Sequence, residues 1–433
     1  MKKKIFGLLA VCAIAVFAVV SVGRTNYKAY YSGDAVNYQG NLIIASVDTG
    51  SLEIFKLNGS SLERVAKLKA SNSVLDKTDD FSSVKLNIEN GHLFAYATSA
   101  YTLYKYDISN PAQPSLYAKQ KNTYYEWYHR VDKLGSNIVT VSNTGVKVWK
   151  TDGDKFDVID SYKLEVNVPS SVRFDASGRY ITTINKDNLV RIYDTSSRRV
   201  VSQFPVNYRN SQTQRKTYFD PTAQEFYVFD DYFLKRFDLN GNLLASQGNS
   251  STSGYGVEAA GNYSYVYAVN GDSILKLSKG DLKTGLKISA WNLTKNGYAM
   301  GLKYVDMNGS DNLVIFNGGG IAVINSSFKK VASIEASEIA DEPEIKEALA
   351  LSLNHYTAAT GTNITLSGAG YLPNEDLKIT FADVISNATT DNNGRFTKTL
   401  IVPEAKKDTV DIKVDGLKSK LTYSTTFKVI KSN

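Results

Sequence analysis

The sequence predicts an all-β protein: a seven-bladed β-propeller followed by a small β-sandwich, with an apolar helix at the N-terminus. A short phrase with an apolar, β-branched core recurs seven times between Leu52 and Ile321, at intervals of about 40 to 50 residues, which is the period of a four-stranded propeller blade. Tyr (28) and Phe (18) far outnumber Met (3) and Cys (1), and aromatic side chains suit pleated strands. After Glu335 the repeat ends and shorter strands separated by turns begin.

The repeated phrase is expected to form one strand of each blade, and a partner strand such as NLIIAS at Asn41 precedes it. The seven phrases are SLEIFKL (from Ser51), TLYKYDI (Thr102), GVKVWKT (Gly145), NLVRIYD (Asn188), FLKRFDL (Phe233), SILKLSK (Ser273) and GIAVINS (Gly320).

Blade boundaries follow from this spacing, within a propeller predicted over 26–335. The segment Asn26–Tyr31 is strand-like, and we expect it to add an outer strand to the seventh blade, which would close the ring and remove exposed sheet edges. The expected blades are 34–70, 81–121, 125–166, 169–206, 214–248, 252–291 and 296–335.

Two blades resemble known repeats. The segment FDASGRYITTINKDNLVRIYDTSSRRVVSQFPV, from Phe174 to Val206, resembles a WD40-type or YVTN-type blade. LYKYDISNPAQP, from Leu103 to Pro114, resembles the LVIVD repeat of bacterial and archaeal surface propellers. No Gly-His pair starts the blades as it does in WD40 repeats, and Tyr193-Asp194 stands where that family has Trp-Asp, so its His–Asp hydrogen-bond network is not expected.

The C-terminal part is predicted to be a linker over 336–355 and a sandwich over 356–433. Asp341, Pro343 and Glu344 form a helix-start signal, so a short helix is expected over 341–353. The phrases GAGYLPNEDLKITF (from Gly368) and TTDNNGRFTKTLIVP (from Thr389) resemble immunoglobulin-like modules of prokaryotic surface proteins. The resemblance implies a spacer or adhesion role.

The N-terminal segment 1–23 predicts export. Lys2, Lys3 and Lys4 precede an apolar run from Ile5 to Val22, 18 residues long, which reaches the length that crosses a bilayer. Positive charge before the run would keep the N-terminus inside and place the rest outside. The length favours a membrane anchor, while the small residues Ser21 and Gly23 leave a cleaved signal peptide as the alternative. Localisation is therefore expected to be membrane-anchored facing outside, or secreted or periplasmic.

The net charge argues against a nucleic-acid partner, and the cysteine content argues against disulfide bonds and thiolate metal sites. The formal net charge is +7, and without the three N-terminal lysines about +4, with no run of Lys and Arg along one element. A nucleic-acid partner is therefore not expected. The single cysteine, Cys12, lies in the apolar run, so the exported domains have no thiol for a disulfide or a metal site.

No catalytic, metal or cofactor motif is present. His92, His129 and His355 are far apart in the sequence, and neither HExxH, paired cysteines nor a GxSxG elbow occurs. The acidic segment Asp306–Asp311 has its glycine at the fourth place rather than the sixth of a calcium loop, which favours a hairpin turn. We expect no cofactor.

The best ligand-binding candidates are the aromatic cluster Tyr124, Tyr125, Trp127 and Tyr128 with the adjacent His129. Stacked rings near a propeller channel can hold a sugar or a peptide. The alternative is an inner strand packed between neighbouring blades. Arg209 and Arg215, between blades four and five, are candidates for a rim that attracts anions.

The predicted function is non-enzymatic: an extracytoplasmic binding or scaffold protein whose propeller presents a recognition face to a protein or a glycan at the cell surface. One alternative is a propeller enzyme, such as a metal-dependent lactonase or a quinone-dependent dehydrogenase, which needs several carboxylates or histidines converging on the channel. Another is an envelope assembly factor.

Overall fold

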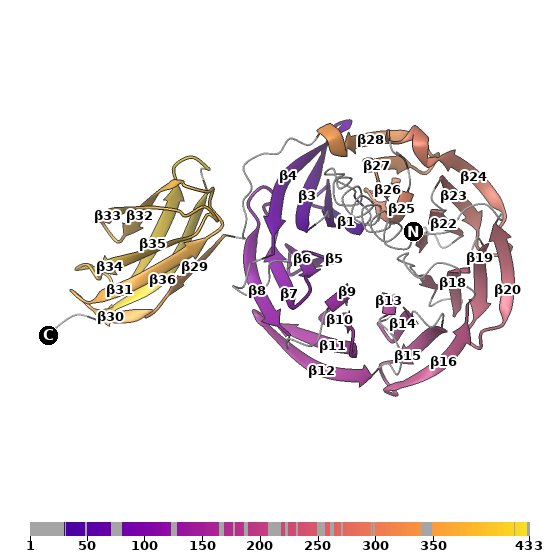
Figure 1. Ribbon diagram of the computed structural model, residues 1–433, viewed down its shortest axis with the longest axis horizontal. Coiled ribbons are helices and arrows are strands. Elements are labelled where there is room, and N and C mark those ends of the chain that lie inside the picture. Colours follow the sequence, from indigo (N-terminus) through magenta and orange to yellow (C-terminus); the bar gives the residue numbers. More distant parts are fainter. Residues whose placement is uncertain are drawn as a thin grey trace, which may run out of the picture.

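A computed structural model describes most of the chain after residue 29 (Figure 1). It describes Tyr30 and residues 32–430 apart from 48–49, 71–79, 123–127, 164–168, 176–177, 186–188, 207–217, 221–223, 231–232, 249–255, 260–263, 270–271, 296, 298, 339–348 and 420. Strands dominate this part, and its helical elements are two 3-10 turns, η1 (Ala290–Asn292) and η2 (Ala336–Glu338). The all-β prediction is confirmed.

Seven antiparallel sheets of four consecutive strands, here called sheets 1 to 7, follow one another along the described chain. The seven repeated phrases form the third strand of each sheet. Sheets 1 to 3 are β1 (Ser32–Tyr38), β2 (Asn41–Val47), β3 (Ser51–Asn58) and β4 (Ser61–Lys69); β5 (Ser83–Glu89), β6 (His92–Thr98), β7 (Thr102–Asp107) and β8 (Ser115–Lys121); and β9 (Tyr128–Leu134), β10 (Asn137–Ser142), β11 (Gly145–Asp152) and β12 (Lys155–Lys163).

Sheets 4 to 7 repeat the same order of hairpins. They are β13 (Pro169–Phe174), β14 (Tyr180–Asn185), β15 (Leu189–Asp194) and β16 (Arg199–Pro205); β17 (Tyr218–Asp220), β18 (Glu225–Asp230), β19 (Phe233–Asp238) and β20 (Leu243–Gly248); β21 (Gly256–Ala259), β22 (Tyr265–Val269), β23 (Ser273–Ser278) and β24 (Thr284–Ser289); and β25 (Ala299–Asp306), β26 (Asp311–Asn317), β27 (Gly320–Asn325) and β28 (Lys330–Glu335).

The sheets stand around a central opening, with the first strand of each innermost and the fourth outermost (Figure 1). Buried apolar clusters fill the gaps between successive sheets, including the gap between sheet 7 and sheet 1. In that last gap, Phe316 of β26 and Phe55 of β3 belong to one cluster. Burial of apolar surface between sheets, rather than one central core, therefore holds the ring together.

The ring closes differently from the prediction for Asn26–Tyr31. The outer strand of sheet 7 is β28 itself, which meets β4 through the single parallel pair Ser333 and Ser61. Residues 26–29 and 31 lie outside the described residues. The Tyr30 N–H donates to Asn317 O at 3.2 Å, and its hydroxyl donates to Glu53 at 2.7 Å, so Tyr30 connects sheets 7 and 1 beside their cores rather than at the outer edge.

All seven sheets carry a β-bulge at the same place, between the third and fourth strands. In sheet 2, for example, Lys105 pairs with Ala118 and Tyr106 with Leu116, which leaves Tyr117 as the extra residue. A bulge bends the strand, increases its twist and releases one side chain from the ladder. The bulged residues are Val65, Tyr117, Ile159, Val201, Leu244, Gly285 and Val331.

The residue just before each bulge belongs to a line of paired residues that runs across the first three strands of its sheet, here called the register row. In sheet 2, Lys85 of β5 pairs with Tyr96, and Tyr96 pairs with Lys105, the last residue before the bulge. Corresponding pairs exist in the other six sheets. The innermost members of the row are Asp34, Lys85, Asp132, Arg173, Tyr218, Glu258 and Lys303.

The C-terminal part forms two further sheets around a separate buried core that includes Leu366, Ile379 and Phe427. The strand β30 pairs parallel to β36, and the other pairs are antiparallel. One sheet contains β29 (Ala350–Leu353), β31 (Asn363–Ala369) and β34 (Phe396–Ile401); the other contains β30 (Thr357–Ala359), β36 (Thr422–Ile430), β35 (Thr409–Gly416), β32 (Asp376–Phe381) and β33 (Val384–Thr389).

The helical linker prediction for 336–355 is wrong where the chain is described. Ala350–Leu353 is strand β29, because its apolar side chains pack in the C-terminal core instead of forming a helix face. The strands of this module therefore begin before residue 356. Ala336–Glu338 form a single 3-10 turn, and the helix-start signal at 341–344 lies outside the described residues.

The predicted N-terminal segment 1–23 also lies outside the described residues. In the part of the chain that the structure describes, no helix has the length and apolar character needed to cross a bilayer.

Candidate functional site

The structure describes part of the predicted aromatic cluster. Tyr124, Tyr125 and Trp127 lie outside the described residues, and so do Arg209 and Arg215. His129 lies in β9, but its side chain is among those not described.

Tyr128 is the member of the cluster whose side chain is described. It is only 2% exposed, and its ring packs edge-on against Trp149 with centroids 6.4 Å apart. It belongs to the core between sheets 2 and 3, together with Phe94 and Tyr96. The structure thus places Tyr128 in the packing role that the sequence leaves as the alternative.

The other sequence candidates lie at the surface or in turns. His92 begins β6, and His355 is exposed between β29 and β30. Asp306–Asp311 form the hairpin turn between β25 and β26, where the Gly309 N–H donates to Asp306 Oδ1 at 2.7 Å. This segment is the turn that its glycine position predicts.

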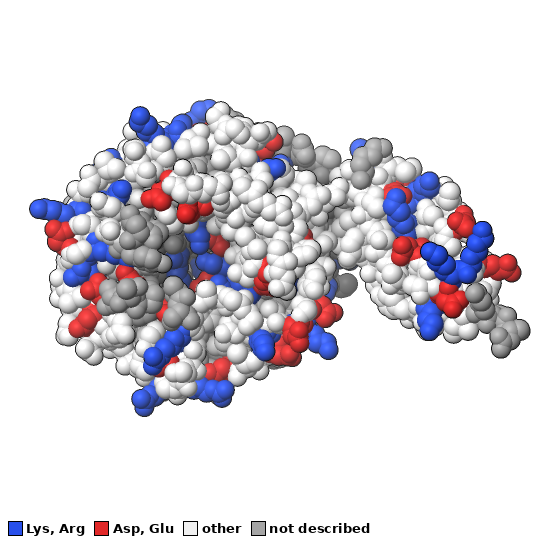
Figure 2. Space-filling model, turned by 180° about the vertical axis from the view of Figure 1, so that it is seen from behind, with Lys and Arg blue, Asp and Glu red and all other residues white. Residues whose placement is uncertain are grey.

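Charged side chains of the register row form ion pairs on the inner strands. Lys303 Nζ lies 3.1 Å from Asp34, and Lys85 Nζ lies 3.7 Å from Asp34 and 3.2 Å from Asp132. Basic and acidic side chains are visible within the hollow at the centre of the ring (Figure 2). Sheets 7, 1, 2 and 3 are therefore joined by a chain of alternating charges.

The same carboxylates also bind the backbone of the next sheet. Asp34 accepts a hydrogen bond from the Leu86 N–H at 2.9 Å, and Asp132 accepts one from the Phe174 N–H at 2.7 Å. Burial raises the pKa of Asp34, but Lys303, Lys85 and the Leu86 N–H together outweigh burial and lower it to about 2. Asp34 is therefore ionised near neutral pH, and the hydrogen bonds of both aspartates connect neighbouring sheets.

This arrangement does not provide a metal centre. Among the described residues, no group of three or more His, Cys, Asp or Glu side chains is placed to hold a metal ion. Asp34 and Asp132 are paired with lysines, which would compete with a cation.

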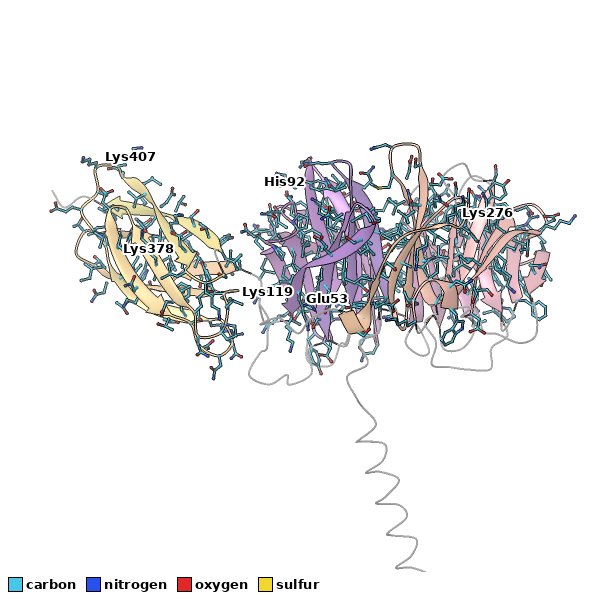
Figure 3. All side chains as sticks on the ribbon, turned by 90° about the horizontal axis from the view of Figure 1, so that it is seen from above. Glu53, His92, Lys119, Lys276, Lys378 and Lys407 are labelled. Carbon is cyan, nitrogen blue, oxygen red and sulfur yellow. The ribbon has the colours of Figure 1, made fainter. Side chains whose placement is uncertain are left out.

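A cavity of about 590 Å³ lies between sheets 2 and 3. It opens where the β5–β6 hairpin meets the β9–β10 and β11–β12 hairpins, and His92 marks this edge of the ring in Figure 3. The lining side chains include Glu89, His92, Lys105, Asp107, Tyr117 and Asp152.

A buried ion cluster forms the inner wall of the cavity. The carboxylate of Glu89 lies 3.0 Å from Lys105 Nζ and 3.0 Å from Lys133 Nζ. The Tyr96 hydroxyl donates to Glu89 Oε1 at 2.6 Å. Both lysines are almost fully buried, so Glu89 is the counter-ion that makes their burial tolerable.

This environment shifts the titration of the cluster. Burial raises the pKa of Glu89, but the Tyr96 hydroxyl and the two lysines outweigh it and lower the pKa to about 2. Burial, followed by the bond to Glu89, raises the pKa of Tyr96 well above its usual value. Glu89 is therefore ionised and Tyr96 neutral throughout the physiological range.

Aromatic rings enclose Lys105 on the outer side. Lys105 Nζ lies 4.2 Å from the centroid of the Phe94 ring and 4.6 Å from that of Tyr117. The Tyr117 ring meets Phe94 edge-on, with centroids 5.2 Å apart, yet it remains 43% exposed. Tyr117 is the bulged residue of sheet 2, where the other six sheets have Val, Ile, Leu or Gly.

His92 and Asp107 form a polar rim. His92 Nδ1 lies 3.3 Å from Ser109 Oγ and 3.5 Å from Asp107 Oδ2, and Asp107 Oδ1 accepts the Ser109 N–H at 2.8 Å. The His92 side chain is 60% exposed. The cavity thus combines a held aromatic ring with hydrogen-bonding groups of fixed position.

Sequence reasoning missed this site because it selected the segment between sheets 2 and 3 rather than the turns on either side. Lys105, Asp107 and Tyr117 do lie in or beside the LVIVD-like phrase and β8, but that phrase signalled only the fold. The available signal was a cation, Lys105, at a strand position that is apolar in four of the seven sheets and cationic in sheets 5 and 6 as well.

A scan against protein-family models finds no match for this chain, and a search of the curated proteins finds none either.

Proposed function

We propose that this chain is a non-enzymatic extracytoplasmic binding protein, built from a seven-bladed β-propeller and an immunoglobulin-like sandwich. Seven four-stranded sheets and the buried clusters in every gap between them support the propeller. Two sheets around their own core support the sandwich module, which would act as spacer or contact.

One observation carries the binding role: the cavity between sheets 2 and 3 presents an aromatic ring and polar groups that other contacts hold in place. The Glu89 carboxylate on its inner wall already accepts the Tyr96 hydroxyl and pairs with Lys105 and Lys133. A carboxylate with its pKa lowered to about 2 is a poor general base near neutral pH. Such a site favours recognition over catalysis.

The N-terminal sequence supports an extracytoplasmic location. Lys2, Lys3 and Lys4 followed by the apolar run Ile5–Val22 favour a membrane anchor with the domains outside, or a secreted or periplasmic protein after cleavage. The partner would be a protein or a glycan of the cell surface, with the membrane reached through the N-terminal segment.

Localisation and partners can be tested together. The full chain with a C-terminal tag is expressed in its own cells. One portion of the cells is treated with protease, before and after the outer envelope is opened, and a second portion is cross-linked without protease and purified from membranes. We expect protease to remove the tag while the cytoplasmic membrane is intact, and a surface partner to be cross-linked to the chain. A tag that stays protected until the cytoplasmic membrane is lysed, or turnover of a lactone or an alcohol by the purified chain, would contradict the proposal.

A further inference from the structure

We propose that the cavity between sheets 2 and 3 binds a neutral saccharide, whose ring stacks on Tyr117. This inference rests on the proposed binding function and gives it a ligand class. It follows from the aromatic ring, from the polar groups opposite it and from the charge balance of the wall.

The tyrosine at position 117 is not required by the fold. The same bulge is made with Val65 in sheet 1, Val201 in sheet 4 and Val331 in sheet 7, and with Gly285 in sheet 6. The bulged residues Ile159, Val201 and Leu244 are 42–44% exposed, as Tyr117 is at 43%, so sheet 2 differs in carrying an aromatic ring at this position and not in its exposure.

The ring is also fixed in place. Phe94 contacts it edge-on, and Lys105 Nζ lies 4.6 Å from its centroid. A sugar presents a face of C–H groups with partial positive charge, which suits the negative face of an aromatic ring. A ring held before binding loses little conformational entropy when a ligand stacks on it.

Polar groups surround the ring at positions set by other contacts. Asp107 and Asp152 provide acceptors, His92 provides a donor and acceptor pair, and Asn87 and Asn90 provide amides along the wall. Hydroxyl groups donate and accept, so a polyol can satisfy such a mixed wall. The volume of about 590 Å³ lies within the range of small-molecule pockets.

The charge balance selects a neutral sugar over an acidic one. Lys105 and Lys133 share the single carboxylate of Glu89, so this cluster carries one net positive charge, and the two aspartates of the lining bring the whole group to one net negative charge. Asp107 and Asp152 stand at the cavity and would repel a carboxylate or a sulfate. An anionic glycan therefore meets net repulsion.

The test uses the full chain in nanodiscs or in a detergent without a sugar headgroup, since glycoside detergents would compete. Saturation-transfer NMR and titration are carried out with lactose, maltose and N,N′-diacetylchitobiose, and with 3′-sialyllactose as the anionic probe. We expect at least one neutral disaccharide to bind, and Tyr117→Val to weaken it about tenfold. The matched control, Val201→Ala at the same bulge of sheet 4, should leave binding unchanged.

Three results would overturn the inference: no neutral disaccharide binding up to about 10 mM, unchanged affinity in Tyr117→Val, or tighter binding of 3′-sialyllactose than of lactose. Circular dichroism of Tyr117→Val checks its fold, and valine at three equivalent bulges makes it a compatible residue. If membrane cross-linking captures only a polypeptide, the saccharide inference fails while the proposed binding function stands.

Discussion

Sheets 2 and 6 share a lysine–tyrosine pair beside the bulge, but the surroundings of that pair differ. In each, a lysine precedes the bulge and pairs with a tyrosine of the second strand: Lys105 with Tyr96, and Lys276 with Tyr267. Lys105 Nζ lies 4.2 Å from the Phe94 ring, and Lys276 Nζ lies 4.2 Å from the ring of Tyr265, at the equivalent position.

The residues of the neighbouring sheet determine whether the gap beside the lysine–tyrosine pair is filled or forms a cavity. Beside sheet 6, Tyr304 of β25 stacks parallel to Tyr267 at 6.5 Å, and Phe328 packs on the same ring. Beside sheet 2, the residue equivalent to Tyr304 is Lys133, whose ammonium lies 5.1 Å from the Tyr96 ring and binds Glu89. An aromatic stack fills one gap, whereas an ion cluster and a cavity occupy the other.

The bulged residue adds a second difference. Tyr117 covers Lys105 in sheet 2, while Gly285 leaves the corresponding position of sheet 6 without a side chain. The comparison shows that the register row, repeated in every sheet, determines which side chains meet between neighbouring sheets. A few different residues in and beside this row change a packed gap into a cavity lined by charged and aromatic groups.

The largest expected effect comes from removing the carboxylate that pairs with two buried lysines beside sheet 2. Glu89→Gln should lower the free energy of unfolding by about 2–4 kcal/mol, because Lys105 and Lys133 lose their counter-ion while still buried. Urea unfolding followed by tryptophan fluorescence measures the loss.

The matched change beside sheet 6 is Asp311→Asn. Asp311 accepts the Tyr304 hydroxyl at 2.7 Å, and an amide oxygen can replace that acceptor, so the loss should stay below about 1 kcal/mol. Equal losses in the free energy of unfolding for Glu89→Gln and Asp311→Asn would show that the ion cluster stabilises the fold no more than an ordinary hydrogen bond does.

Lowering the pH should remove part of the stability difference between the native chain and Glu89→Gln, because acid protonates Glu89. The pKa of Glu89 is lowered from its ordinary 4.5 to about 2 in the fold, so its ionised form stabilises the protein above pH 4.5. That stability is lost as the pH falls from 4.5 through about 2. The difference in Tm between the native chain and Glu89→Gln should therefore shrink over this interval. A constant difference would argue against the ion pairing.

The smallest effect is expected from giving sheet 6 the residue of sheet 2. At Gly285 an added Cβ would meet only Lys276 O at 3.6 Å, so Gly285→Tyr should change the free energy of unfolding by less than about 0.5 kcal/mol. It should not create disaccharide binding, because Tyr304 and Phe328 fill the gap to sheet 7. Saturation-transfer NMR checks this. New binding at sheet 6 would show that the tyrosine alone suffices.

The strands were predictable from the sequence because each is a local pattern. Phrases such as TLYKYDI at Thr102 became third strands, since alternating apolar residues must bury one face. The helix predicted over 341–353 failed at Ala350–Leu353, because a neighbouring strand offered those side chains a core that local capping signals do not report.

The cavity was not predictable, because it depends on which residues of separate sheets share a register. Glu89, Tyr117 and Asp152 come from three different hairpins, and nothing in their local sequence places them together. The bulge that turns Tyr117 outward has no residue signature, since valine, isoleucine, leucine, glycine and tyrosine all occupy it.

The tolerance of the bulged position for different residue types has an evolutionary consequence. Because the bulged residue makes no ladder pair, a mutation there leaves strand alignment intact, and each of the seven sheets holds one such position on the perimeter. Val65 and Val331 pack against buried cores, whereas the bulged residues of the other five sheets are exposed, so the ring offers five positions that can change independently while the strands stay in place. A lineage can acquire or discard a contact at one of them without refolding the rest.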